Sequence, residues 1–89
     1  MKSIQGIELS NNYKKSFRKL HLKIQEEALK KIAFFQINPF HPILKTHKLS
    51  GKEKEHWGFW INYTYRIKFL FLNEEKVLFL GIGTHDIYK

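Results

Sequence analysis

The sequence predicts an α+β domain in which an N-terminal strand and a helical pair pack on an antiparallel sheet, in the order β-α-α-β-β-β. Three observations support this class. Apolar residues recur at helical spacing in the first half, Asn38–Pro39 interrupts them, and apolar and polar residues alternate in the second half. The 89 residues suit one core, so residues 1–89 are expected to fold as a single domain.

The first half is predicted to contain one strand followed by helix. Residues 2–9 alternate roughly between apolar and polar side chains, which favours a short strand. Ser10, Asn11 and Asn12 are typical N-cap residues, so a helix is expected to begin there. Leu20–His21–Leu22 disturbs the helical repeat without a Gly or Pro, so the segment is either one long helix or a hairpin of two. The apolar positions of the repeat are Tyr13, Phe17, Leu20, Ile24, Ala28, Ile32 and Phe35.

A basic loop is expected between the helical half and the β half. Asn38–Pro39 ends the helix, because a residue that precedes proline disfavours the helical conformation. Residues 40–54 contain the Pro and Ser-Gly signals of loops and turns. His41, His47 and His56 follow no usual zinc-ligand spacing, so no metal site is predicted. The basic residues of the loop are His41, Lys45, His47, Lys48, Lys52 and Lys54.

Three consecutive antiparallel strands are predicted in the second half, over residues 57–61, 65–72 and 76–83. If the first hairpin turns through residues 62–64, Trp60 lies opposite Arg66 and Gly58 lies opposite Lys68. A shift of one residue would exchange the two faces of the sheet. In the stated register the core face takes Trp57, Phe59, Ile61, Tyr65, Ile67, Phe69 and Phe71, and the open face takes Trp60, Arg66, Lys68, Leu70, Leu78 and Leu80.

The net charge favours a polyanionic partner. Sixteen basic and eight acidic residues give a formal charge of +8, and fourteen of the sixteen are Lys. Lys suits sequence-independent phosphate contacts, although Lys-rich surfaces also serve solubility. On the predicted open face, an RNA base can stack on Trp60 while phosphates pair with Arg66 and Lys68. The leucines at the other end of that face suit a protein partner.

Composition excludes several function classes. The chain has no Cys, which excludes disulfides, thiolate catalysis and cysteine-based zinc or iron–sulfur sites. The sequence shows neither a signal-peptide pattern nor an apolar run of membrane-spanning length. We therefore expect a cytoplasmic protein without a membrane partner.

Three groups of residues, in their order and spacing, resemble the RelE/ParE superfamily of toxins, particularly mRNA interferases of the RelE, YoeB and YafQ type. The first is Asn38–Pro39–Phe40–His41–Pro42 followed by His47–Lys48–Leu49–Ser50–Gly51. The second is a strand led by Trp57 and ending in Ile61, with Tyr65–Arg66–Ile67 on the next strand. The third is Gly81–Ile82–Gly83–Thr84–His85–Asp86–Ile87–Tyr88. The N-terminal strand and helical pair fit the family's usual order, so the resemblance covers nearly the whole chain.

The resemblance implies the toxin of a type II toxin–antitoxin system, which cleaves mRNA on the ribosome without a metal or another cofactor. In that reaction the 2′-hydroxyl attacks the adjacent phosphate and leaves a 2′,3′-cyclic phosphate and a 5′-hydroxyl. The resemblance also implies a cognate acidic antitoxin, which we expect to cover Leu70, Leu78 and Leu80.

The site residues are expected from the resemblance and from what this reaction needs. His85 is the candidate for proton transfer, because imidazole titrates near neutral pH. Arg66 is the candidate phosphate clamp, and Tyr88 is expected to stack on a base or assist in proton transfer. The residues expected to bind RNA are His47, Lys48, Lys52, Trp60 and Lys68.

The sequence departs from the family at Trp60. Many members have Trp–Ser–x–Arg–Ile on this strand, with the Arg in the active site, whereas this chain has Trp57–Gly58–Phe59–Trp60–Ile61. Either Lys68 or Lys48 replaces the missing cation, or Trp60 stacks on a base or on Arg66. Two alternative functions therefore stay open: a ParE-like DNA gyrase inhibitor that acts by binding, and a catalytically weak RNA-binding relative.

Overall fold

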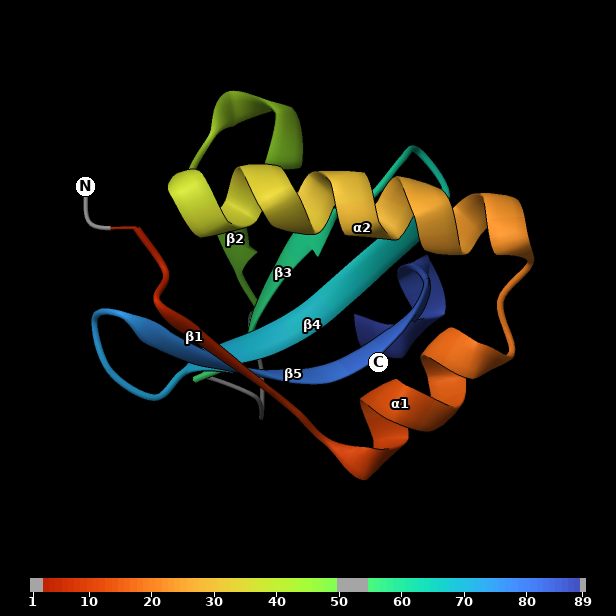
Figure 1. Ribbon diagram of the computed structural model, residues 1–89, viewed down its shortest axis with the longest axis horizontal. Helices are drawn as coiled ribbons and strands as arrows, with labels where there is room; N and C mark the ends of the chain where they lie inside the picture. The colour runs from red at the N-terminus through yellow and green to blue at the C-terminus, as the bar shows by residue number, and fades with distance from the viewer. Residues whose placement is uncertain (1–2, 50–54, 89) are drawn as a thin grey trace.

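The computed structural model describes residues 3–49 and 55–88 and confirms the α+β class (Figure 1). The helices and strands are β1 (Gly6–Leu9), α1 (Asn11–Arg18), α2 (Leu22–Ile37), the 3-10 turn η1 (Pro42–Leu44), β2 (His47–Lys48), β3 (Trp57–Trp60), β4 (Tyr65–Phe71), β5 (Lys76–Thr84) and the 3-10 turn η2 (His85–Tyr88). In the described part of the chain, no helix is long and apolar enough to cross a membrane.

The helical segment is a hairpin of two helices. Ser10 is the N-cap of α1, as predicted, and its side chain accepts a hydrogen bond from the backbone N–H of Tyr13. The chain leaves the helical conformation at His21, the N-cap residue of α2. Gln25 Nε2 then donates to the carbonyl of Phe17 at 2.9 Å, beside the backbone N–H of Leu20, which donates to the same carbonyl at 3.1 Å, so α2 is tied to the end of α1. The disturbed repeat around Leu20 therefore marks a turn.

The sheet has five strands in the order β1-β5-β4-β3-β2. β3, β4 and β5 are antiparallel neighbours, and the predicted pairs Trp60–Arg66 and Gly58–Lys68 are confirmed. β1 joins the sheet parallel to β5, which makes the sheet mixed, because the two helices carry the chain across one face before it returns. The expected loop at residues 40–54 contains the two-residue strand β2, which pairs with the start of β3.

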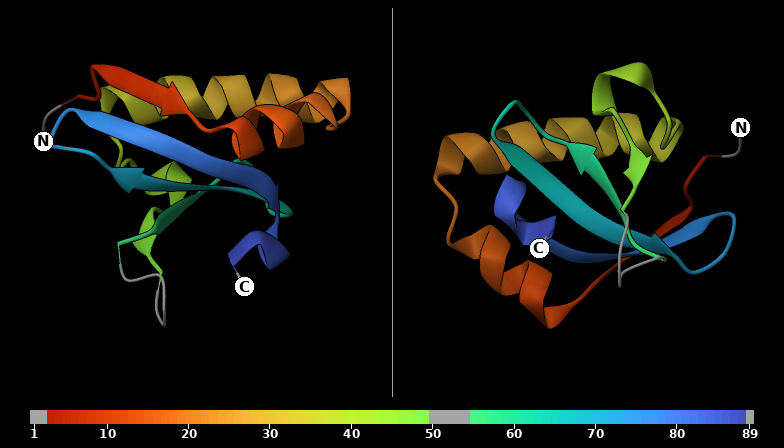
Figure 2. Two further views of the ribbon diagram at one scale, coloured as in Figure 1. Left: turned by 90° about the horizontal axis from the view of Figure 1, so that it is seen from below. Right: turned by 180° about the vertical axis from the view of Figure 1, so that it is seen from behind.

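Both helices lie on one side of the sheet and η2 lies on the other (Figure 2). The core between helices and sheet is built around Phe35 of α2, which stacks on Phe59 with ring centres 4.6 Å apart. Phe35 also meets Phe69 and Phe79 edge-on, at 5.0 and 5.8 Å. Each such pair adds about 0.5–1.5 kcal/mol to the burial of its rings. The predicted core face is confirmed: Phe59, Ile61, Ile67 and Phe69 are buried, and Trp57, Tyr65 and Phe71 pack against them.

An irregularity in β5 fixes α1 to the sheet. Lys68 pairs with Gly81 and Phe69 pairs with Phe79, which leaves Leu80 without a partner in β4. The Leu80 carbonyl accepts hydrogen bonds from Ser10 Oγ at 3.1 Å and from Asn12 Nδ2 at 2.9 Å. Bulges of this kind often re-aim a strand beside a functional site, and β5 leads directly into η2.

Candidate functional site

Two adjoining hollows are lined in common by Trp60, Arg66 and His85. The first has a volume of about 370 Å³ and is also lined by Lys45 and His47; we call it the basic hollow. The second, which we call the polar hollow, has a volume of about 440 Å³. Its further lining residues are Tyr63, Thr64, Thr84 and Asp86.

Arg66 is a buried cation that holds the β3–β4 loop. Its exposed fraction is 6%. Its Nη1 donates hydrogen bonds to the carbonyls of Asn62 at 2.8 Å, Tyr63 at 2.7 Å and Tyr65 at 3.2 Å. Its Nε is buried without a hydrogen-bond partner in the described part of the chain. A buried guanidinium is costly unless acceptors surround it, so these carbonyls explain why the charge can lie there.

The β3–β4 loop is also fixed by two other side chains. Asn62 Oδ1 accepts hydrogen bonds from two backbone N–H groups of the turn, at 2.9 and 2.8 Å, as in an Asx turn. Lys31 of α2 donates from Nζ to the carbonyl of Ile61 at 2.9 Å. Together with Arg66, these bonds keep the backbone of the loop in place, with Tyr63 at its tip.

Trp60 covers the guanidinium of Arg66, and its ring centre lies 4.0 Å from the guanidinium carbon. This contact confirms the cation–π alternative that the hairpin register allowed. Tyr63 meets Trp60 edge-on, with ring centres 6.0 Å apart. A cation–π contact with a desolvated cation is worth about 2 kcal/mol. The Trp60 ring therefore stabilises the cation that lies opposite it on β4.

The segment after η1 places another cation beside Trp60. Lys45 Nζ lies 5.3 Å from the centre of the Trp60 ring. The backbone of Lys45 is in the left-handed region, with a φ of 49°. Leu44 on one side of it is fully buried, and His47 Nδ1 on the other side lies 2.9 Å from the Lys45 carbonyl oxygen. The turn is thus fixed on both sides of Lys45.

His85 reaches both hollows because η2 folds back at the end of β5. It is the first residue of η2 and is exposed. Gly83, two residues earlier, pairs with Arg66 across the sheet. A Cβ on Gly83 would lie 2.7 Å from Ile87 Cγ2, which is closer than real Cβ contacts allow. The absence of a side chain at Gly83 therefore permits the close approach that positions His85.

The structure brings Arg66, His85, His47 and Trp60 together, and separates them from other predicted residues. Lys48 is exposed on β2 and Lys68 is half-buried on β4, and neither lines the two hollows. Lys52 and the side chain of Tyr88 lie outside the described part of the chain. The predicted antitoxin surface is half-buried: Leu70 pairs with Leu78, and Leu80 is the extra residue of the bulge.

Sequence reasoning does not single out Lys45 or Tyr63. Lys45 is one of several basic residues in a loop, and its positive φ has no sequence signal because the residue is not Gly or Asn. Tyr63 could be found from the hairpin register, since it occupies the turn directly after Trp60.

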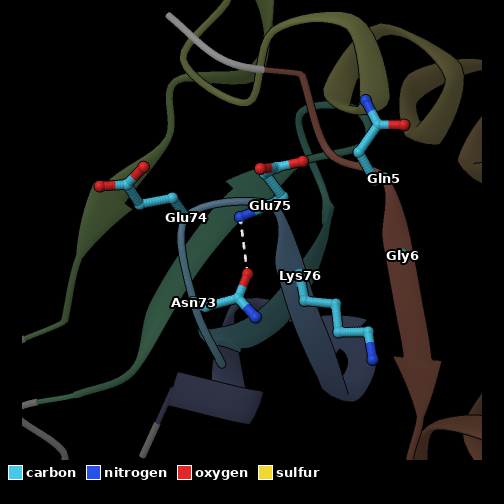
Figure 3. A pocket seen from close by; sticks show the side chains of 6 residues that line it. All are labelled: Gln5, Gly6, Asn73, Glu74, Glu75 and Lys76. Atoms are coloured by element: carbon cyan, nitrogen blue, oxygen red, sulfur yellow. Dashed lines mark hydrogen bonds between the residues drawn. The ribbon is translucent and has the colours of Figure 1, made fainter.

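Among the residues that the structure describes, two other hollows lie away from this site. One is at the β4–β5 turn, where Asn73 Oδ1 accepts the N–H of Glu75 at 2.8 Å (Figure 3). The other is an apolar groove of about 330 Å³ between β1, α1 and α2. The groove is lined by Ile7, Leu9, Tyr13, Phe17, Leu29, Ile32, Gln36 and Phe79. Across the described residues, no three His, Asp or Glu side chains are grouped as metal ligands.

No family model and no curated protein matches the sequence. Solved structures match over nearly the whole chain. The YoeB/ParE toxin from Agrobacterium tumefaciens superposes with a TM-score of 0.73 at 15% identity, over 96% of this chain and 99% of that chain. This chain has the RelE/ParE toxin fold.

Two toxin–antitoxin complexes contain chains of the same fold. A chain of the DinJ-YafQ complex from E. coli matches with a TM-score of 0.69 at 24% identity, over 91% of this chain and 92% of that chain. A chain of the RelBE2 complex from Mycobacterium tuberculosis matches with a TM-score of 0.71 at 16% identity, over 96% and 100%. The resemblance found in the sequence motifs is therefore confirmed at the level of the RelE/ParE fold.

Proposed function

We propose that the protein is the toxin of a type II toxin–antitoxin system and that it cleaves mRNA on the ribosome. The observation that carries this proposal is the basic hollow, where the imidazoles of His47 and His85 lie with the cations of Lys45 and Arg66. The RelE/ParE fold and the formal charge of +8 support the same substrate, because both favour a protein that acts on a polyanion.

The proposed reaction needs one group that accepts a proton and one that donates a proton. The 2′-oxygen gives its proton to a base and bonds to phosphorus, while the bond from phosphorus to the 5′-oxygen breaks and that oxygen takes a proton from an acid. The products are a 2′,3′-cyclic phosphate and a 5′-hydroxyl, and neither a metal nor a cofactor is required. His85 is the principal proton-transfer group, and His47 in the same hollow can serve as its partner.

Positive charge must also stabilise the phosphorane that forms during this reaction. Arg66 would act from its buried place as a fixed charge, because its Nη1 is engaged by loop carbonyls. In the proposal Tyr88 stacks on a base or assists in proton transfer. In the proposal the residues that contact RNA are His47, Lys48, Lys52, Trp60 and Lys68.

An acidic antitoxin is the second part of the proposal. Two of the matched chains come from complexes of a toxin with its antitoxin, and the charge of +8 favours an acidic partner. We propose that this partner covers the open face of the sheet at Leu70, Leu78 and Leu80.

Primer extension on an mRNA in a bacterial translation extract tests the nuclease. The wild type is compared with His85→Gln, which preserves size and polarity but removes the imidazole. The matched control is His21→Gln, because His21 is an exposed histidine at the start of α2 that lines neither hollow. We expect ribosome-dependent cuts from the wild type and the control, and cutting slower by about 100-fold or more from His85→Gln.

Other results would contradict the proposal in distinct ways. An intact message in cells that the protein still arrests would reject the nuclease and favour the binding and inhibition of DNA gyrase. Salt-dependent RNA binding without any cut would instead indicate a catalytically weak RNA-binding protein.

A further inference from the structure

The two hollows differ in chemistry, although they share Trp60, Arg66 and His85. The basic hollow adds an ammonium and an imidazole, whereas the polar hollow adds a phenol, two hydroxyls and a carboxylate. Phosphates pair with cations, and bases stack on aromatic rings and hydrogen-bond through their edges. We infer that one RNA nucleotide spans both hollows, with its phosphate at Lys45 and its base on Tyr63. This inference rests on RNA as the proposed substrate.

The case for Lys45 begins with Arg66. The guanidinium is covered by Trp60, and its Nη1 is engaged by three carbonyls, so the cation that the sequence suggests as a clamp is largely engaged in holding the fold. Lys45 is exposed, lines the same hollow and approaches the same ring. It therefore presents the mobile charge that a phosphate can pair with.

The backbone of Lys45 points to the same role. A φ of 49° suits Gly or Asn far better than Lys, so the backbone of Lys45 is strained. The turn itself is held by the buried Leu44 and by the contact of His47 with the Lys45 carbonyl, and neither involves the ammonium. Strained side chains of this kind cluster at ligand sites. A Gly at this position would relieve the strain but would remove the ammonium that lies beside Trp60.

Tyr63 has the properties of a platform for a base. Its exposed fraction is 84%, although the loop that carries it is fixed by Arg66, Asn62 and Lys31. An exposed aromatic ring on a fixed loop, in edge contact with Trp60, offers a surface on which any base can stack. Thr64, Thr84 and Asp86 in the same hollow supply hydroxyl and carboxylate groups for the edge of the base.

Equilibrium binding of a short RNA tests the assignment of each part of the nucleotide. The probe is a fluorescein-labelled hexaadenylate with 2′-O-methyl groups, which blocks the attacking oxygen, and binding is followed by fluorescence anisotropy from 25 to 200 mM salt. A second probe of the same length lacks the bases but retains the phosphates. The variants are Lys45→Gly and Tyr63→Ala, with Lys30→Ala and Phe34→Ala as controls, because both control residues are exposed on α2 and line neither hollow.

The two variants should weaken RNA binding in different ways. Lys45→Gly should weaken binding of both probes and lower the slope of log K against log salt by about 0.7, the value for one phosphate of a single strand. Its thermal unfolding temperature should be equal to that of the wild type or higher, because Gly relieves the positive φ. Tyr63→Ala should weaken the hexaadenylate by about tenfold with an unchanged slope, and should leave the probe without bases unaffected.

The inference is overturned if Lys45→Gly keeps the wild-type slope, if Tyr63→Ala lowers the slope, or if the controls behave like the variants. It is also overturned if the wild type binds neither probe. The proposed nuclease is tested separately by primer extension. If the cuts depend on His85 but both variants bind RNA like the wild type, only the assignment of phosphate to Lys45 and base to Tyr63 is rejected.

Discussion

At the scale of single residues, Arg66 both holds the β3–β4 loop and places a positive charge at the candidate site. Its Nη1 donates to three carbonyls of one turn while its guanidinium carbon lies 4.0 Å from the centre of the Trp60 ring, and a lysine ammonium lacks the planar group that stacks on such a ring. We expect Arg66→Lys to lower the free energy of unfolding by about 2–3 kcal/mol in urea titrations. Arg18→Lys, which changes the chain's other arginine at an exposed position, should change it by less than about 0.5 kcal/mol. Equal effects of the two variants would show that the turn does not depend on Arg66.

Tyr13 is expected to make the stability fall at high pH. Burial raises the pKa of Tyr13 from 10.0 to about 12, because the phenolate would lose its hydration in the core. The resulting contribution is fully present below pH 10 and is lost as the pH rises towards 12, because the unfolded chain releases the proton first. We expect the wild type to lose about 2–3 kcal/mol relative to Tyr13→Phe over that interval, measured by urea unfolding. A constant difference between the two proteins across this range would contradict the buried, protonated phenol.

At the scale of elements, local pairings could be predicted from the sequence and distant ones could not. A short turn between alternating strands sets the register of β3 and β4, so the Trp60–Arg66 pair follows from the hairpin alone. The parallel pairing of β1 with β5 joins residues far apart in the chain and has no local signal. The burial of Arg66 could not be predicted from the sequence either, because its acceptors are backbone carbonyls whose directions depend on the folded turn.

The junction of β5 and η2 is where an element controls the candidate site. Gly83→Ala would bring a Cβ to 2.7 Å from Ile87 Cγ2, so η2 should shift and take His85 with it. We expect mRNA cleavage slower by about tenfold or more, because a displacement near 1 Å is enough to misalign a proton-transfer group. Gly6→Ala is the control, because its Cβ would meet only the flexible side chain of Lys76 at the far end of β5. Full activity in Gly83→Ala would show that η2 accommodates the methyl group without moving His85.

At the scale of the whole molecule, two apolar surfaces are alternative binding sites for the proposed antitoxin. The open face carries Leu70 and Leu78, half-buried and opposite each other. On the helical side, the apolar groove includes Leu9 and Leu29, which are 43% and 59% exposed. Lys68 lies on β4 beside Leu70, so an acidic partner on the open face would contact both apolar and basic side chains.

This arrangement predicts which leucines the proposed antitoxin contacts. The tagged chain is used to capture its acidic partner from the source organism, and the purified partner is then titrated by calorimetry. Leu70→Ser with Leu78→Ser should weaken binding by about tenfold to 100-fold, because each serine removes apolar contact area worth roughly 1 kcal/mol. Leu9→Ser with Leu29→Ser serves as the comparison, and thermal unfolding of both double variants shows that each remains folded. If only the second pair weakens binding, the partner occupies the groove between β1, α1 and α2, and the open face remains accessible in the complex.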